Sequence, residues 1–437
     1  MLPSATWEAE LEKWLAPFLG RLGRVERRRW APLYVKGLLL PGERKSIEPL
    51  AERLCPRDVQ QLHHFISTSP WPTPPLEEVL FQKADCLLGG REAVLLVDDT
   101  ALVKQGTASV GVARQYGGEL GKKANCQSLV TLTLARSEVP VAIWMRLFLP
   151  ESWADEAQRC QRAGIPEAER VHRPKWEMAL QGVDEALGAG VRFGCVAADA
   201  EYGKAPEFRR GLAGRGLLYA VGILPRQRAY GADVVMRPPV RKRPGVRPPR
   251  HPVPSVESVQ VAEMIEALGE DAFQEVSWRR GTKGPLKARF AAVRVRMAEG
   301  APIGSGRRAP AEEVLWLVCE WRARGEKKYY LCNHPEETPL KRLVRAIKAR
   351  WSCEQAHEQM KNELGLDHLE CRGWHALQHH TLLVMMAMAF LQHLRIGGEK
   401  KAEVARGSSA VTVAAGDPPR AGSAPERQAT PALSALP

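Results

Sequence analysis

The sequence lacks several features that would assign it to a class at once. Its nine cysteines are scattered singly with no Cys-x-x-Cys pair, which argues against a disulfide framework or a cysteine-rich zinc site. No basic stretch followed by an apolar core opens the chain, so no secretory signal is visible. The most apolar run, 381–391, is too short to span a bilayer. We therefore expect a cytoplasmic, nucleoid-associated protein without a membrane partner.

Acidic residues are fewer than basic residues in this sequence. The chain has 63 Lys and Arg against 50 Asp and Glu, which gives a formal net charge of +13. Such a surplus of positive charge favours a polyanionic partner. Nucleic acid is a better candidate than an anionic membrane surface. With 437 residues, 44% of them hydrophobic, the chain is long enough to bury a large core in two or three domains.

The apolar pattern divides the chain into helical and mixed regions. Residues 1–88 have helical spacing and are expected to form an N-terminal DNA-binding region. In 89–224, short apolar runs alternate with helical patterns, which predicts a mixed α/β layer fold. Residues 331–396 return to helices, and 397–437 is rich in Ala, Pro, Ser and Gly and expected to be disordered.

Between these regions, 225–330 has the period-two alternation of strands and is expected to be a β-rich insertion. It opens on the basic, proline-rich segment 226–250, which cannot bury a core. This segment is either a solvated linker or a contact to phosphates, and the two roles are compatible.

Two short apolar runs end in aspartate. The run "VLLVDDT" (94–100) has the continuous apolar character of a strand covered on both faces, and it meets Asp98 and Asp99. A second run, 195–198, ends in Asp199. The alternatives are a turn or helix cap at 98–100 and a helix N-cap at Asp199. If both strands belong to one sheet, their carboxylates meet at one edge, where a cation would offset the charge.

A third acidic position continues an apolar helical stripe that ends at Trp351. The next positions on that face are Glu354, then His357 or Glu358, and Lys361. The alternative is a ladder of ion pairs on a solvated helix. Three carboxylates at one sheet edge can hold two Mg²⁺ or Mn²⁺ ions about 4 Å apart for phosphoryl transfer.

These motifs resemble the DDE transposases of bacterial insertion sequences, in the branch with a Tyr-Arg-Glu-Lys signature. The family's acidic-Asp-Thr motif matches 98–100, which implies that Asp99 rather than Asp98 is the metal ligand. Three residues separate Arg350 from Glu354 and six separate Glu354 from Lys361, as in the signature. The signature tyrosine falls on Ile347, where this sequence departs from the pattern. The resemblance extends over roughly 20–395.

The resemblance implies an RNase H-like fold: a mixed five-stranded sheet with flanking helices and a β-rich insertion before the last catalytic Glu. It implies two Mg²⁺ (or Mn²⁺) ions for cleavage at the inverted-repeat ends of a transposon and for strand transfer into target DNA. The partners would be double-stranded DNA and a second copy of the chain in a homodimer. The implied metal-binding and catalytic residues are Asp99, Asp199 and Glu354, and the implied DNA contacts are Arg350, Lys361, Lys104, Lys122, Lys123 and Trp316. Each lysine could instead be a solvated loop residue, and Trp316 a core residue on a strand.

Three other functions compete with this prediction. His375, His379 and His380 could chelate zinc, although no further ligands complete a set. A DNA-binding protein derived from a transposase would keep the basic surface without catalysis, but all three acids are present. Another RNase H-like nuclease, such as a resolvase, is disfavoured by the insertion before the last Glu and by the Arg, Glu and Lys spacing.

Overall fold

A computed structural model gives the structure of the protein and describes residues 4–117, 121–238, 252–282, 284–304 and 306–412. The chain forms two compact units, Met1–His393 and Leu394–Pro437. In the second unit the described residues continue helix α14 (Trp374–Thr412), so the first part of the expected tail is helical. The rest of that tail, 413–437, and the second half of the basic proline-rich segment, 239–250, lie outside the described residues.

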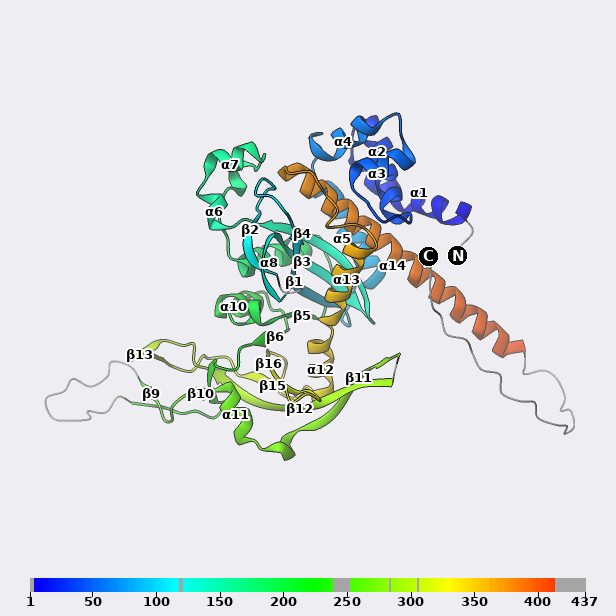
Figure 1. Ribbon diagram of the computed structural model, residues 1–437. Helices are drawn as coiled ribbons and strands as arrows, with labels where there is room; N and C mark the ends of the chain where they lie inside the picture. Colours follow the sequence, from blue (N-terminus) through cyan, green and yellow to red (C-terminus); the bar gives the residue numbers. More distant parts are fainter. Residues whose placement is uncertain (1–3, 118–120, 239–251, 283, 305, 413–437) are drawn as a thin grey trace, which may run out of the picture. The chain divides into compact units, whose positions relative to one another are not determined.

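The N-terminal part is helical and packs on the apolar half of α14 (Figure 1). Its helices are α1 (Ser4–Arg21), α2 (Val25–Leu39), α3 (Ile47–Leu54), α4 (Val59–Ser67) and α5 (Pro74–Leu88). Trp14 of α1 packs against Phe390 of α14 with 6.1 Å between ring centroids. The Tyr34 hydroxyl of α2 lies 2.8 Å from Nδ1 of His380. The N-terminal helices and a C-terminal helix therefore share one core.

Part of α14, Trp374–Gly398, is long and apolar enough to cross a membrane by length and composition alone. Its central side chains, 382–390, are almost fully buried inside the protein. Burial of this kind is what a core helix needs, since its apolar surface already has protein partners.

Strand β1 lies in the middle of one part of the sheet, with two strands on each side of it (Figure 1). These five strands lie in the order β4 (Val139–Phe148), β3 (Lys122–Arg136), β1 (Val94–Val103), β5 (Cys195–Ala198) and β6 (Tyr219–Ile223). Neighbours among β4, β3 and β1 are antiparallel, whereas β5 is parallel to both β1 and β6. The short strand β2 (Ala113–Gly117) pairs with the start of β3. Leu95, Leu96 and Val97 of β1 have no exposed surface, which confirms a strand covered on both faces.

The sheet does not end at β6, so the five strands expected for the core are one part of a larger sheet. Strand β16 pairs antiparallel with β6, so the insertion continues the same sheet to 12 strands within the described residues. The added strands are β16 (Lys327–Cys332), β15 (Leu315–Trp321), β12 (Gly284–Met297), β11 (Gln274–Gly281), β7 (Arg228–Gly231) and β10 (Val259–Gln260). The pairing covers what would otherwise be an open edge of β6.

The remaining elements are short strands and helices around this sheet. The minor strands are β8 (Met236–Arg237), β9 (Val253–Pro254), β13 (Pro302–Gly304) and β14 (Arg307–Arg308). The helices are α6 (Glu151–Ala154), α7 (Ala157–Arg162), α8 (Lys175–Gly188), α9 (Ala200–Gly203), α10 (Pro206–Gly214), α11 (Val261–Ala267), α12 (Leu340–Lys348) and α13 (Trp351–Asn362), with 3-10 turns at Glu167–Glu169 and Glu270–Ala272.

Two glycines let α9 lie directly on β6. A Cβ at Gly203 would collide with the carbonyl oxygen of Gly222 and lie 2.8 Å from Cβ of Val221. A Cβ at Gly222 would lie 2.8 Å from the backbone nitrogen of Ala200. Because α9 follows Asp199 directly, this close approach fixes the backbone that carries the predicted second acid.

Substituting Gly203 by Ala should therefore destabilise the fold. We expect Gly203→Ala to lower the free energy of unfolding by about 2–4 kcal/mol, because backbone has to move away from backbone. The control is Gly214→Ala at the end of α10, where a Cβ meets nothing within 4 Å. Urea unfolding checks both variants, and an equal, small effect would contradict the close approach.

Candidate active site

Strands β1 and β5 bring the three aspartates to one region of the sheet. Strand β1 runs on to Val103 and pairs Asp98 with Thr131 of β3 and Asp99 with Val130. The interpretation of 98–100 as a turn or helix cap is therefore wrong, because β3 supplies a pairing partner along the whole of β1. The parallel register places Val97 beside Ala198, so Asp98 and Asp199 follow at the point where β5 ends.

The side chains of Asp98 and Asp99 leave β1 on opposite faces, as strand geometry requires. On one face, Arg350 donates from Nη1 to Asp98 over 2.7 Å. On the other, Lys175 at the start of α8 donates to Oδ2 of Asp99 over 2.7 Å, and the Ser128 hydroxyl donates to the same oxygen over 3.2 Å. Each carboxylate thus has its own cation from a different helical segment.

Asp199 serves as the N-cap of α9. Its Oδ1 accepts the backbone N–H groups of Glu201 at 2.9 Å and Tyr202 at 3.4 Å. The cap predicted as an alternative is therefore present. It does not compete with a role at the site, because Asp199 also lines a pocket of about 560 Å³ together with Arg350 and Glu354.

Glu354 lies on α13 one turn after Arg350, which donates hydrogen bonds to both Glu354 and Asp98. Glu358, the alternative third acid, is exposed and makes no hydrogen bond or ion pair with the described residues. The geometry therefore favours Glu354 over Glu358. Lys361, two turns further on, donates from Nζ to the carbonyl oxygen of Ala101 in β1 over 2.9 Å.

The aspartates are held in a desolvated and mutually repulsive arrangement. Burial raises the pKa of Asp98 to about 7, against the attraction of Arg350 and with a further contribution from the charge of Asp199. Burial also raises the pKa of Asp199, and the nearby Asp99 adds to this. A cation among these carboxylates would stabilise their ionised forms. The oxygen-only donor set fits Mg²⁺ or Mn²⁺.

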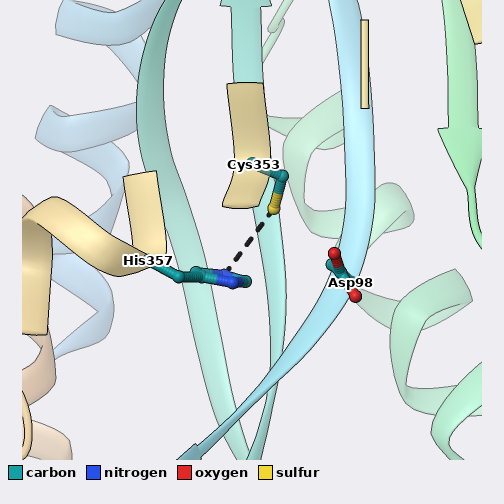
Figure 2. Close-up of side chains that lie close together, drawn as sticks. All are labelled: Asp98, Cys353 and His357. Atoms are coloured by element: carbon teal, nitrogen blue, oxygen red, sulfur yellow. Dashed lines mark hydrogen bonds between the residues drawn. The ribbon is translucent and has the colours of Figure 1, made fainter. Parts of the chain in front are cut away.

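Next to this site lies a buried cluster of Asp98, Cys353 and His357 (Figure 2). One potential ligand atom from each lies within 4.8 Å of the others. The cluster continues into β3, where Thr131 lies 2.9 Å from Nε2 of His357 and Thr133 lies 3.5 Å from Sγ of Cys353. It therefore attaches α13 to β1 and β3 through polar contacts.

This cluster suits a metal ion poorly as it stands. Burial raises the pKa of the Cys353 thiol, so the thiol stays protonated, whereas metals bind the thiolate. Burial lowers the pKa of His357 to about 3, so its imidazole is neutral, which by itself is the form that binds metals. Its Nε2 already contacts the Thr131 hydroxyl and the Cys353 sulfur. We assign the cluster to positioning α13.

The other predicted DNA contacts make no hydrogen bond or ion pair to the three acids among the described residues. Lys104 donates from Nζ to the carbonyl oxygen of Leu369 over 2.7 Å. Lys122 and Lys123 are exposed at the start of β3. Trp316 packs against the buried core formed by β12, β15, β16 and α12, and its indole N–H donates to the carbonyl of Pro335 over 3.1 Å. This is the surrounding expected of a core tryptophan.

Two residues at the site, Lys175 and Trp351, were not assigned to it by the sequence analysis. Lys175 belongs to no recognisable sequence motif, so the residues around it do not identify it as the partner of Asp99. Trp351 was assigned to an apolar stripe, yet its side chain is exposed at the pocket, and the Arg279 guanidinium lies 3.6 Å from its ring. Ile347, at the signature tyrosine position, packs in the core instead of offering a polar group.

The zinc interpretation of the α14 histidines has no support in the described residues. Both ring nitrogens of His379 lie 2.9 Å from carbonyl oxygens, those of Ile66 and Trp71. Nε2 of His380 lies 3.1 Å from the carbonyl of Gly365. Burial lowers the pKa of each of these histidines to about 4. They connect α14 to the helices around it.

The pKa of Asp98 predicts a pH dependence of stability. Between pH 4 and 7 the folded carboxyl keeps a proton that the unfolded chain has released, so stability falls as pH rises. We expect the wild type to lose about 2–3 kcal/mol relative to Asp98→Asn between pH 5 and 8, since one pKa unit is worth about 1.4 kcal/mol. Urea unfolding in EDTA across this range measures the difference. Parallel curves for the two proteins would contradict a raised pKa.

Comparisons with known proteins agree with this geometry. Residues 17–285 match the family model of the DDE superfamily endonucleases. A probable transposase for insertion sequence element IS701 from Microchaete diplosiphon is 29% identical over 162 residues, which are 37% of this chain and 40% of that protein. The alignment thus spans less than half the length of this relative.

Among solved structures, a piggyBac transposase synaptic complex with hairpin DNA is similar to 90% of this chain and 73% of its own, with a TM-score of 0.42 and 9% identity. A similarity of this size carries no weight for fold or function. The family match covers more than half of the chain and includes Asp99 and Asp199. The chain therefore belongs to the DDE superfamily endonucleases, a family of enzymes.

Proposed function

We propose that the protein is a DDE transposase. It would cleave DNA at the inverted-repeat ends of a transposon in the presence of Mg²⁺ and join the freed 3′-hydroxyl to target DNA. The observation that carries this proposal is that β1 and β5 bring Asp98, Asp99 and Asp199 close together, while Arg350 connects Asp98 to Glu354 of α13 and Asp199 and Glu354 line one pocket. Membership of the DDE superfamily endonucleases supports the same reaction class.

An RNase H-like core is the fold that we propose for the catalytic region. It is supported by the five-strand order β4-β3-β1-β5-β6, in which the first three strands are antiparallel neighbours and the last two run parallel to β1. Helix α8 on one face and α13 on the other supply the flanking layers that such a core needs. The longer strands of the insertion extend this sheet, whereas β8 with β9 and β13 with β14 form two small separate sheets.

Asp99, Asp199 and Glu354 would hold two Mg²⁺ or Mn²⁺ ions. Such ions activate the attacking oxygen and stabilise the leaving oxygen of a phosphoryl transfer. The cap on α9 fixes Asp199 before any cation arrives, because two backbone N–H groups hold its Oδ1. Lys175 pairs with Asp99, and Arg350 pairs with Asp98 and Glu354. For a ligand role, Asp99 has to be released by Lys175 and Glu354 by Arg350.

The pocket beside the acids suits a DNA strand. Its wall carries six Arg and Lys side chains, among them Arg322, Lys327 and Lys328, against the two acids Asp199 and Glu354. Positive charge around the acids offsets their repulsion of a phosphodiester, and contacts to phosphates position a strand without reading its sequence. Arg350 and Lys361 would contact phosphates near the scissile bond. Since two ends must be joined, we propose a homodimer with two such sites.

Cleavage of DNA that carries the element's own ends tests the proposal. With Mg²⁺, the wild type should nick at the ends, whereas Asp99→Asn, Asp199→Asn and Glu354→Gln should bind the DNA and lose at least about a hundredfold in cleavage rate. The control Glu358→Gln changes the neighbouring exposed glutamate on the same helix and should stay within about twofold.

The same assay with Asp98→Asn separates the two adjacent aspartates. We expect Asp98→Asn to cleave faster than Asp99→Asn, because Asp98 anchors Arg350 in this arrangement. If Asp99→Asn cleaves faster than Asp98→Asn, Asp98 is the metal ligand and the proposed roles of the two aspartates are exchanged. If the wild type and all variants bind equally and none cuts, the chain is a DNA-binding relative without catalysis.

A further inference from the structure

A second, strongly basic hollow lies at the far end of the same strands. It has a volume of about 710 Å³ and is lined where β1 and β5 begin, by the turn between β3 and β4, and by the exposed side of α12. Seven Arg and Lys side chains line it against two Glu, Glu92 and Glu138. We call it the α12 groove. Because β1 and β5 are parallel, it lies opposite the edge that carries Asp199.

Most of the positive charge in the α12 groove is uncompensated. Lys341, Arg342 and Arg345 are exposed on one side of α12 and form no ion pair with the described residues. The opposite side of α12 is apolar and buried, with Leu343 and Val344 fully covered. The helix is therefore fixed in place, and its cations are held together despite their mutual repulsion. A polyanion in the groove would relieve this repulsion.

The α12 groove adjoins the active-site pocket. Trp278, Arg279, Lys348 and Trp351 line both hollows. Arg279 stacks on Trp351 at 3.6 Å and is held at the rim by Glu138, whose carboxylate lies 2.9 Å away. A DNA segment that occupies the groove would therefore lead towards the catalytic acids.

We propose that the α12 groove binds the phosphate backbone of the recipient duplex, the DNA into which the transposon ends are joined. The proposal rests on the transposase function proposed above. The lining contains no Asn or Gln, the side chains that pair with adenine, and three of its cations lie along the exposed side of one helix. Such a surface positions a duplex without selecting a sequence. This suits a recipient DNA of varying sequence better than an end of fixed sequence.

The test removes charge from the groove and leaves the acids intact. The variant carries Lys341→Gln, Arg342→Gln and Arg345→Gln, and the control carries Arg162→Gln, Arg324→Gln and Arg372→Gln. All six side chains are exposed and unpaired among the described residues, and the control residues lie outside both hollows. Both proteins therefore lose the same charge.

Binding to a duplex of unrelated sequence is measured from low to high salt. The groove variant should bind more weakly and reduce the slope of log affinity against log salt by about 3, since each lost phosphate contact removes about 0.9. The control should change the slope by less than about 1. Equal losses in both variants would overturn the proposal, because total charge would then explain the binding. An unchanged slope in the groove variant would overturn it as well.

Cleavage at the ends and joining to recipient DNA are then measured separately. The groove variant should cleave end DNA within about twofold of the wild type and lose at least about tenfold in joining. Loss of cleavage and joining together would overturn the proposal, since the groove would then serve the ends. If the wild type itself does not cleave, the proposed function fails, and the salt dependence still decides whether the groove binds DNA.

Discussion

The structure depends on how negative charge is accommodated where β1 lies beside the end of β5. Asp98, Asp99 and Asp199 converge there, and burial, with the charge of neighbouring carboxylates adding to it, raises the pKa of Asp98 and of Asp199. Such a concentration of carboxylates is costly unless cations accompany it. The chain supplies two of its own, Arg350 from the α12–α13 junction and Lys175 from α8. Each approaches from a different face of the sheet, as the alternation along β1 requires.

The rest of the fold holds these groups in register. The glycine contact between α9 and β6 sets the backbone after Asp199, and the α9 cap orients the side chain itself. On the other face, the polar contacts of Cys353 and His357 with β3 attach α13, which carries Glu354. A basic pocket and the adjoining α12 groove surround this acidic centre. Acids at the centre and bases around it form the charge pattern expected of a metal-dependent enzyme that acts on DNA.

Much of this was predictable from local sequence. Continuous apolar runs located β1 and β5, and the helical stripe ending at Trp351 located the helix that carries Glu354. What failed were features set by distant partners. Strand β1 continues through its two aspartates because β3 pairs with it throughout, and the sheet extends past β6 because β16 pairs there. No local pattern encodes either pairing.

The same limit applies to single residues. Lys175 lies 76 positions from Asp99 and meets it only because α8 packs on the sheet. The histidine pair of α14 looked like a chelating motif, but its ring nitrogens face carbonyl oxygens of the helical region and its connections. In both cases the chemistry of the side chain was known, and its neighbours were not.

The central claim is that the carboxylates around β1 and β5 form a divalent-cation site. While no cation is bound, Arg350 and Lys175 offset the negative charge of this site. Anomalous diffraction from crystals soaked in Mn²⁺ tests it most directly. We predict Mn²⁺ between Asp99, Asp199 and Glu354, with Arg350 displaced from Glu354 and Lys175 displaced from Asp99. Mn²⁺ bound by Cys353 and His357 instead, or no Mn²⁺ at the three acids, would contradict the account.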